Sequence, residues 1–586
     1  MSTSNPFASD WLRAGAADVG RPEGGLSYVR GATSDPLKFF TIPALLERAV
    51  MRHGARDAVI YAPTRERLSW HDLKRRSDDV AAGLLALGVK RSDRVGIWAP
   101  NCVEWLLVQF GTARIGAILV NINPAYRATE LEYALKKVGC RVLIMAAQLK
   151  SSDYVAMLKS LAPEIDRASR SEPLVLERFP RLERVVLIGE GARPPGVLGF
   201  KELAALAGPA QRGRLTALSA ALDPDDAINI QFTSGTTGSP KGATLSHYNI
   251  VNNARYSAKA MRLGERDRLC IPVPLYHCFG MVLGVLACTA TGATMVFPSA
   301  SFDAEDTLRA VHEHRCTALH GVPSMFIAEL DHPRFDAYDT SSLRTGIMAG
   351  APCPIETMRR VIAQMHMTEV TIGYGMTETS PISFQSSTAD PLERRVSTVG
   401  RVQPHCEVKI VDGDGRIVPV GVAGELCTRG YLVMHHYWKD PEHTQASIDA
   451  AGWMHSGDLA TLDADGYCNI VGRVKDMLIR GGENVYPREI EEYLFRHPKI
   501  QEAQVFGVPD PRFGEEVCAW IVLKPGATAT EQEVRDFCRG QIAHYKIPRY
   551  VRFVPELPRT VTGKAQKFAM REAMMRELGQ RPARTA

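Results

Sequence analysis

A ten-residue segment decides how this chain is expected to fold: Thr233-Ser-Gly-Thr-Thr-Gly-Ser-Pro-Lys-Gly242. It stands between a predicted strand, residues 227–232, and a predicted helix, residues 247–261. Its glycines let the backbone turn several N–H groups toward one point, its hydroxyls add donors and Lys241 adds positive charge, which together suit a polyphosphate. It is not the common Gly-x-x-x-x-Gly-Lys-Ser/Thr loop, because Pro240 precedes the lysine and Gly242 follows it.

The segments before this loop alternate between helical and strand-like patterns. Residues 44–53 and 70–87 have helical periodicity, whereas residues 94–98, 117–121 and 141–145 are short apolar runs typical of buried strands. Such alternation predicts β-α-β units with a mostly parallel sheet. The predicted fold class is therefore α/β.

The chain changes character after residue 400. Short β-rich runs are punctuated by Asp412-Gly413, Asp414-Gly415 and Asp465-Gly466, which are hairpin signals and predict a small antiparallel sheet or barrel. The Gly-, Ala- and Pro-rich stretch 189–213 is interpreted as an irregular surface connection.

Two domains are expected from a chain of 586 residues. Residues 1–474 are predicted to form a large domain of layered α/β subdomains plus a small β-barrel-like subdomain. Residues 475–586 are predicted to form a small, mobile α+β domain.

Composition excludes several classes of protein. The chain is 45% hydrophobic with a net charge of +5, which gives no reason to expect a nucleic-acid partner. Twelve cysteines without any Cys-x-x-Cys pair argue against a zinc ribbon and a disulfide framework, and favour a reduced, cytoplasmic protein. The N-terminus resembles no secretory signal, and the apolar run 281–297 is too short and too polar to span a membrane. That run is interpreted as a buried helix followed by a strand.

The phosphate loop and four later motifs occur in the order found in the adenylate-forming superfamily, which they resemble. That superfamily includes acyl-CoA synthetases, peptide-synthetase adenylation domains and firefly luciferases. The four motifs are Tyr374-Gly-Met-Thr-Glu-Thr379, Ser456-Gly-Asp-Leu459, Gly472-Arg-Val-Lys-Asp476 and Pro558-Arg-Thr-Val-Thr-Gly-Lys564. The resemblance extends from about Ile42 to Met570. It is greatest to medium-chain fatty-acyl-CoA synthetases, through Arg480-Gly-Gly-Glu-Asn-Val-Tyr-Pro487 and residues 272–279.

The resemblance implies ATP, Mg²⁺ and coenzyme A as cofactors or co-substrates. Thr377 would contact the α-phosphate, and Glu378 would bind Mg²⁺, a hard cation that prefers carboxylate oxygens. Asp458 and Arg473 would contact the ribose. The other nucleotide-binding residues implied are Thr233, Ser234, Gly235, Thr236, Thr237, Gly238 and Lys241 in the phosphate loop, Gly350, Ala351, Pro352, Tyr374 and Gly375 around adenine, and Lys475 and Gly482.

The acyl site is expected around His277. In the family this position lies beside the acyl pocket and moves between half-reactions. A gating role is preferred to a general base, because a carboxylic acid is already ionised at pH 7. Candidate pocket residues are Phe279, Gly280, Val322, Met348 and Gly373.

Lys564 is the expected catalytic lysine, which in the family binds both the carboxylate and the α-phosphate. Lys475 occupies the hinge position about which the C-terminal domain would rotate. Eight Lys or Arg residues and one acid lie between Arg539 and Arg571, so a positive field near the entry for the phosphates of coenzyme A is expected. The setting of Lys564 also resembles the site that lysine acyltransferases modify, which makes a lysine acetyltransferase an expected partner.

Several functions remain open on these grounds. The leading function is that of an ATP-dependent ligase that converts a fatty acid to acyl-AMP and then to acyl-CoA. Medium-chain acids are the leading substrates, followed by long-chain, aryl and short thioether-containing acids. A fatty acyl-AMP ligase loading a carrier protein is an alternative, although no carrier domain follows Lys564. A luciferase-like oxygenase on the same fold is another. A non-catalytic nucleotide-binding protein is disfavoured because Glu378 and Lys564 are both present.

Overall fold

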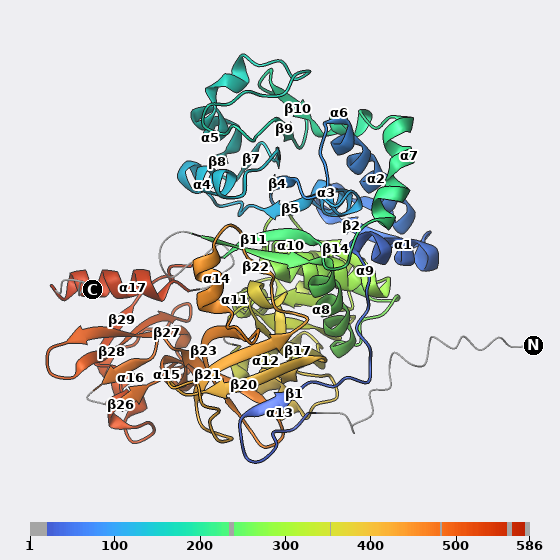
Figure 1. Cartoon of the computed structure of the whole chain (residues 1–586). Coiled ribbons are helices and arrows are strands. Elements are labelled where there is room, and N and C mark those ends of the chain that lie inside the picture. Colours follow the sequence, from blue (N-terminus) through green and yellow to red (C-terminus); the bar gives the residue numbers. More distant parts are fainter. Residues whose placement is uncertain (1–19, 234–239, 352, 481–482, 560–564, 580–586) are drawn as a thin grey trace, which may run out of the picture.

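The computed structural model describes residues 20–233, 240–351, 353–480, 483–559 and 565–579 (Figure 1). Within these ranges no helix is both long and apolar enough to cross a membrane. The twelve cysteines are all free thiols, as expected from their spacing.

The phosphate-loop segment belongs to an eight-stranded sheet. Six neighbouring strands are parallel, and the last two continue the sheet in antiparallel pairing. In spatial order the strands are β10 (Val197–Gly199), β9 (Arg184–Leu187), β6 (Val142–Met145), β4 (Arg94–Trp98), β5 (Ile118–Asn121), β11 (Ala227–Thr233), β12 (Lys241–Ser246) and β22 (His436–Tyr437).

A nine-stranded sheet carries the second half of the site. Its six central strands, β17 to β2, are parallel, with antiparallel strands at both edges. The order is β19 (Arg401–Val402), β18 (Ile382–Gln385), β17 (Glu369–Gly375), β16 (Thr345–Ala349), β15 (Ala318–Gly321), β13 (Arg268–Cys270), β14 (Thr294–Phe297), β2 (Asp57–Tyr61) and β3 (Glu66–Ser69).

The largest core cluster contains side chains from both sheets, such as Ile97 of β4 and Ile347 of β16, and from the helices between them. Those helices are α1 (Ile42–His53), α2 (Trp70–Ala86), α3 (Val103–Arg114), α8 (His247–Ala260), a π-helix (Phe279–Leu286) and α9 (Ala287–Thr291). Alternate residues of the same strands, such as Trp98 and Met348, enter two other clusters on the outer faces. The outcome is the layered α/β architecture predicted from the sequence.

Helices also cover the outer faces of both sheets. The eight-stranded sheet is flanked by α4 (Ala128–Val138) and α5 (Tyr154–Leu161), and the nine-stranded sheet by α10 (Ala304–His314), α11 (Pro323–Leu330) and α12 (Ile355–Gln364). The remaining helices of this part are α6 (Phe200–Ala205), α7 (Pro209–Ala220), α13 (Leu392–Ser397) and α14 (Pro441–Ser447).

The region after residue 400 forms a five-stranded antiparallel sheet, in agreement with its hairpin signals. The order is β1 (Tyr28–Arg30), β20 (Cys406–Val411), β21 (Gly424–Gly430), β23 (Met454–Leu462) and β24 (Cys468–Arg473). Strand β1 pairs with β20 although it precedes it by more than 370 residues, a long-range pairing that no local pattern indicates.

The C-terminal part builds its own sheet and its own cores, all from residues after Met477 (Figure 1, red end). Its strands are β26 (Glu483–Val485), β25 (Leu478–Arg480), β28 (Gly514–Leu523), β27 (Ile500–Asp510) and β29 (Tyr550–Phe553). Its helices are α15 (Pro487–Leu494), α16 (Glu531–Cys538) and α17 (Lys567–Glu577).

One local expectation from the sequence is wrong and one strand is missed. The phosphate-loop motif does stand between strand β11 and helix α8, as predicted, but the sequence does not indicate β12, which pairs antiparallel with β11 before α8 begins. The stretch 189–213 is not irregular throughout. Val197–Gly199 is buried and extends the parallel sheet beside β9, and α6 and α7 follow it. Burial against a neighbouring strand outweighs the Gly/Pro-rich composition there.

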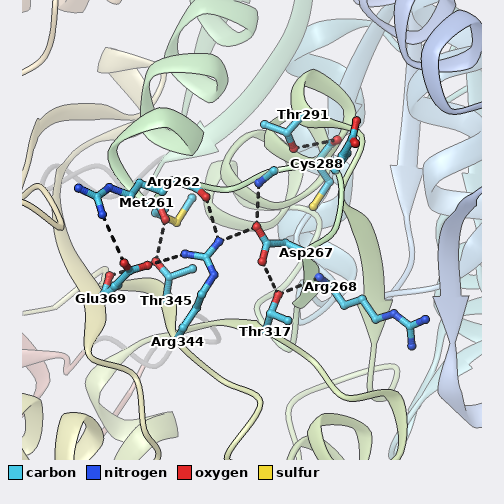
Figure 2. A network of polar contacts seen from close by, with 12 residues as sticks. Met261, Arg262, Asp267, Arg268, Cys288, Thr291, Thr317, Arg344, Thr345 and Glu369 are labelled. Carbon is cyan, nitrogen blue, oxygen red and sulfur yellow. Dashed lines mark hydrogen bonds and ion pairs between the residues drawn. The ribbon is translucent and has the colours of Figure 1, made fainter. Parts of the chain in front are cut away.

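A polar network ties together the amino ends of the central strands of the nine-stranded sheet (Figure 2). Arg344, just before β16, donates to Asp267 at 2.6 Å and to Glu369 at 2.5 Å. Thr317, just before β15, donates to the other oxygen of Asp267 at 2.7 Å. These contacts hold β13, β15, β16 and β17 in register at their amino ends. The candidate site lies at the opposite, carboxyl ends of the strands.

The buried carboxyl group of Glu329 should make the stability of the protein depend on pH. It lies in α11, is 1% exposed, and neither carboxyl oxygen has a hydrogen-bond partner within the described ranges. Burial raises the pKa of Glu329 well above that of an ordinary glutamate. Between the two pKa values only the folded state keeps the proton, so the free energy of unfolding should fall as pH rises, by about 1.4 kcal/mol per pH unit.

We therefore expect Glu329→Met to flatten the pH dependence of stability above the ordinary glutamate pKa. The exposed Glu313→Met on α10 serves as the matched control and should leave the slope as it is in the parent. Urea unfolding at a series of pH values measures this. Equal slopes in the parent and in Glu329→Met would contradict the assignment of a protonated, buried carboxyl.

Candidate active site

The hexapeptide Tyr374–Thr379 is the centre of the site. It begins with the last two residues of β17 and continues beyond the carboxyl end of that strand, where ligands bind in open α/β sheets. Thr377 and Glu378 are 8% and 5% exposed in a short 3₁₀ turn. Thr233 Oγ1 donates to Glu378 Oε1 at 3.1 Å, and Tyr437 Oη donates to the same oxygen at 2.8 Å. The end of the phosphate-loop strand β11 thus meets the hexapeptide at one carboxylate.

Lys241, near the carboxyl end of the phosphate-loop motif, also lies close to the Glu378 cluster. Strand β12 begins at Lys241, which pairs with Thr233 across the hairpin. The Lys241 Nζ lies 4.8 Å from the ring centroid of Tyr437, within the range of a cation–π contact. The structure therefore brings Thr233, Lys241 and Glu378 close together.

A second polar cluster forms around Asp458. Tyr374 Oη donates to Asp458 Oδ2 at 2.6 Å, and Arg473 Nε lies 3.1 Å from Asp458 Oδ1. Asp458 and Arg473 are direct cross-strand partners on β23 and β24. Burial, followed by the negative charge of Asp458, raises the pKa of Tyr374, so its hydroxyl remains a donor. The predicted ribose contacts and the predicted adenine wall are thus adjacent.

Glu425 and Cys427 of the neighbouring strand β21 support this cluster together with His455 of β23 itself. The Glu425 carboxylate accepts from Gly457 N–H at 3.1 Å and lies 2.9 Å from His455 Nδ1. Cys427 lies opposite His455 in the β21–β23 register, and the ligand atoms of the three residues lie within 4.8 Å of one another. Gly457 has φ +68° and directly precedes Asp458 within β23, so its contact with Glu425 fixes the backbone conformation that presents the Asp458 carboxylate.

The two glycines expected around adenine have little space for a larger side chain. Gly350 follows β16 with φ +85°, and a Cβ there would lie 3.1 Å from Val322. A Cβ on Gly375 would lie 1.7 Å from the carbonyl oxygen of Pro381, so only glycine fits. Ala351 follows Gly350 and is half-buried. At Gly350 and Gly375 the backbone itself favours glycine.

His277 lies two residues before the π-helix begins at Phe279 and is half-buried. Its Nδ1 accepts from the N–H of Phe279 at 3.1 Å. The next residue, Cys278, donates to Gln231 of β11 at 3.0 Å, which places this segment against the phosphate-loop strand. π-Helical turns are rare and frequently occur at functional sites. The apolar run 281–297 is a buried helix followed by β14, as predicted.

The candidate acyl-pocket residues divide between two faces of the nine-stranded sheet. Phe279, Gly280, Val322 and Gly373 lie on the side of the core cluster between the sheets. Met348 packs in the outer cluster instead, so its assignment to the same pocket is wrong. Strand alternation explains the difference, because the neighbours Ile347 and Ala349 enter the cluster that contains Phe279.

The basic C-terminal region is largely neutralised. Seven of its eight basic residues lie within the described ranges, and each is within 4.0 Å of a carboxylate. The pairs are Arg539–Asp536, Lys546–Glu489, Arg549–Glu516, Arg552–Glu577, Arg559–Glu502, Lys567–Glu491 and Arg571–Glu515. Most of the acids come from distant parts of the domain, so the positive field is weaker than the local sequence indicates.

Some predicted residues are not placed at the site. Lys475 is exposed in the turn after β24, two residues from Arg473. Ser234, Gly235, Thr236, Thr237, Gly238, Pro352, Gly482 and Lys564 lie outside the described residues. Their roles stay predictions from the motifs.

Sequence reasoning missed Tyr437 and Glu425. Tyr437 lies in His435-His-Tyr-Trp438, about 60 residues after Glu378, and only the pairing of β22 with β12 brings it to the site. The run of aromatic residues after an apolar segment was the available signal. Glu425 is on the strand before the Ser-Gly-Asp motif and carries no motif of its own.

Comparison with known proteins agrees with this geometry. The family model described as AMP-binding enzyme matches residues 46–438, and the model for its C-terminal domain matches residues 489–564. A putative acyl-CoA synthetase, YngI of Bacillus subtilis, is 49% identical over 91% of this chain and 96% of that protein. The mitochondrial medium-chain acyl-CoA ligase ACSF2 of Danio rerio is 47% identical over 94% of this chain and 91% of that protein.

Solved structures show the same architecture. The anthranilate CoA ligase AuaEII in complex with anthranoyl-AMP has a TM-score of 0.83 and 29% identity, covering 93% of this chain and 99% of that one. A benzoate CoA ligase from Burkholderia xenovorans LB400 has a TM-score of 0.77 and 26% identity, covering 91% and 100%. The ordered motifs, the layered fold and these matches together show that the chain belongs to the AMP-binding enzyme family.

Proposed function

We propose that this protein is an ATP-dependent, AMP-forming acyl-CoA ligase acting on a fatty acid, with medium-chain acids as the leading substrates. The observation that carries the proposal is the hexapeptide Tyr374–Thr379, which links the phosphate-loop cluster at Glu378 to the Asp458–Arg473 cluster. One short segment thus joins residues suited to the phosphates with residues suited to the ribose. The names of YngI and ACSF2 support the thiol and the acyl class.

The reaction joins two anions and therefore needs donors and positive charge. In the first step a carboxylate oxygen bonds to the α-phosphorus of ATP and the α–β anhydride breaks, releasing pyrophosphate. In this proposal Lys241 and Thr377 stabilise the charge that develops there, while the hydroxyl of Thr233 holds Glu378. In the second step the thiol sulfur of coenzyme A bonds to the acyl carbon, AMP leaves and the thiol proton is released.

The residues at Glu378 fit Mg²⁺. Both described donors contact Oε1, and within the described ranges Oε2 of Glu378 receives no hydrogen bond. A carboxylate oxygen with neighbouring threonine hydroxyls is a hard donor set, which suits a cation that also takes phosphate and water ligands. When bound, the ion would neutralise charge on the pyrophosphate leaving group.

Residues 475–586 are proposed to act as the mobile domain that delivers Lys564, with Lys475 at the hinge. The separate cores after Met477 support a boundary near that position. A carrier-protein acceptor and a luciferase-like oxygenase are not favoured, because the relatives and structural neighbours named above are CoA ligases. Cytoplasmic location and modification of Lys564 by a lysine acetyltransferase stay predictions from the sequence.

A panel of carboxylic acids tests this function. Straight-chain acids of increasing length, aryl acids and short thioether-containing acids are each assayed for pyrophosphate release, with and without coenzyme A. We expect medium-chain acids to give the highest kcat/KM and coenzyme A to accelerate turnover. Turnover that coenzyme A does not accelerate would contradict the ligase assignment.

A further inference from the structure

Tyr437 contacts two groups of the proposed site at once. It is 3% exposed on β22, where it pairs with Ala243 of β12, and Thr444 Oγ1 accepts from its backbone N–H at 3.0 Å. Its hydroxyl donates to Glu378 Oε1 at 2.8 Å, and the Lys241 Nζ lies 4.8 Å from its ring centroid. One side chain therefore lies between the carboxylate and the lysine.

The pattern of hydrogen bonds fixes the orientation of the Glu378 carboxylate. Tyr437 and Thr233 both donate to Oε1, which stops the carboxylate from rotating. The backbone carbonyl of Glu378 is held as well, because it accepts from Met434 N–H at 2.9 Å. No donor among the described residues contacts Oε2, which is thereby left as the oxygen available to a ligand.

The geometry gives Tyr437 the role of donor. An ionised carboxylate can only accept hydrogen bonds, so the contact between the Tyr437 hydroxyl and Glu378 Oε1 uses the phenol proton.

We propose that Tyr437 is a positioning residue for metal-assisted adenylation, which holds Glu378 Oε1 so that Oε2 faces Mg²⁺ and holds Lys241 beside the phosphates. The inference rests on the proposed ligase function. Partners that orient a metal ligand typically change metal affinity by about 10- to 100-fold when they are removed. A tyrosine that only packed the core would change stability without changing the demand for metal.

Tyr437→Phe separates these roles, because it keeps the ring next to Lys241 and removes only the hydroxyl. We expect the Mg²⁺ concentration for half-maximal acyl-adenylate formation to rise by roughly 10-fold, with most of kcat recovered at saturating Mg²⁺. Tyr437→Leu removes the ring as well and should raise the KM for ATP in addition, since Lys241 loses its contact.

The chain offers a matched control in Tyr467. This tyrosine is also 3% exposed, donates to a carboxylate, Asp390, at 2.8 Å, and has Arg401 4.0 Å from its ring centroid. Tyr467→Phe should lower stability by a similar amount and leave the Mg²⁺ requirement unchanged. Thermal unfolding of each variant measures the stability part.

Two measurements that do not depend on turnover complete the test. Mn²⁺ binding in the presence of a non-hydrolysable ATP analogue, followed by electron paramagnetic resonance, should weaken by roughly 10-fold in Tyr437→Phe and not in Tyr467→Phe. If Tyr437→Phe does not fold, 3-fluorotyrosine is placed at position 437 or 467 of the full chain. Adding Mg²⁺ to the ATP complex should then shift the ¹⁹F signal at 437 only.

The outcomes are distinguishable from failure of the proposed function. Wild-type enzyme that shows no acid- and coenzyme A-dependent pyrophosphate release contradicts the ligase proposal itself. An active wild type whose Tyr437→Phe variant has an unchanged Mg²⁺ requirement and unchanged Mn²⁺ affinity overturns the role of Tyr437. A ¹⁹F signal at position 437 that does not shift when Mg²⁺ is added also overturns the role of Tyr437.

Discussion

Replacing Glu378 by alanine is expected to lower the rate of acyl-adenylate formation by roughly 100- to 1000-fold, equivalent to about 2.7 to 4 kcal/mol of transition-state stabilisation. The carboxylate is 5% exposed and is held through Oε1 by Thr233 and Tyr437, so it is preorganised rather than mobile. Removing it withdraws the proposed metal ligand at the step in which pyrophosphate leaves. Coenzyme A attack on pre-formed acyl-adenylate releases no pyrophosphate and should be affected less.

Two further variants show whether the loss reflects chemistry or folding. Glu378→Gln keeps an oxygen acceptor for Tyr437 and loses the charge, so it should fold normally and still show the adenylation defect. Glu369→Gln changes the first residue of β17, the strand that leads into the hexapeptide; its partner is Arg344, and the change should lower stability only. Thermal unfolding and the metal dependence of each half-reaction are measured together. Reduced stability with an unchanged metal requirement in Glu378→Ala would reject the metal assignment.

Lys564→Ala is expected to reduce adenylation by a similar factor, roughly 100- to 1000-fold, because a positive charge that bridges the carboxylate and the α-phosphate acts as one preorganised transition-state donor. Acetylation of Lys564 removes the same charge and should have the same effect. If the C-terminal domain rotates between half-reactions, this lysine is withdrawn during thioester formation. Synthetic acyl-adenylate should therefore still be converted to acyl-CoA by the variant.

Lys567→Ala is the matched control for this experiment. Lys567 lies three residues further along, at the start of α17, and its Nζ donates to Glu491 at 2.6 Å. Its loss should lower the stability of the C-terminal part and leave the ratio of the two half-reactions unchanged. An equal loss of both half-reactions in Lys564→Ala would instead indicate general misfolding and exclude a lysine that acts in adenylation alone.

The sequence predicted the elements of the large domain well where local signals were strong. Strand β4 at Arg94–Trp98 and helix α8 from His247 match their predicted ranges closely, because a continuous apolar run or a 3.6-residue period is a local property of the chain. It failed at β10, where three residues in a Gly/Pro-rich stretch become a strand only because β9 is beside them. It also missed β12, because the phosphate-loop motif before this strand and the helical pattern of α8 after it are stronger local signals.

For the site, the sequence by itself determined the chemistry. Glu378, Asp458, Arg473 and the phosphate loop were identified because their motifs specify residue type and order, which folding does not alter. Only the tertiary structure decided which of them touch and what holds them. Tyr437 reaches Glu378 through a two-residue strand at the edge of another sheet, and Glu489 and Glu516 neutralise Lys546 and Arg549, which the local sequence leaves uncompensated. Strand pairing and ion pairing join residues far apart in the chain, and no local pattern records such contacts.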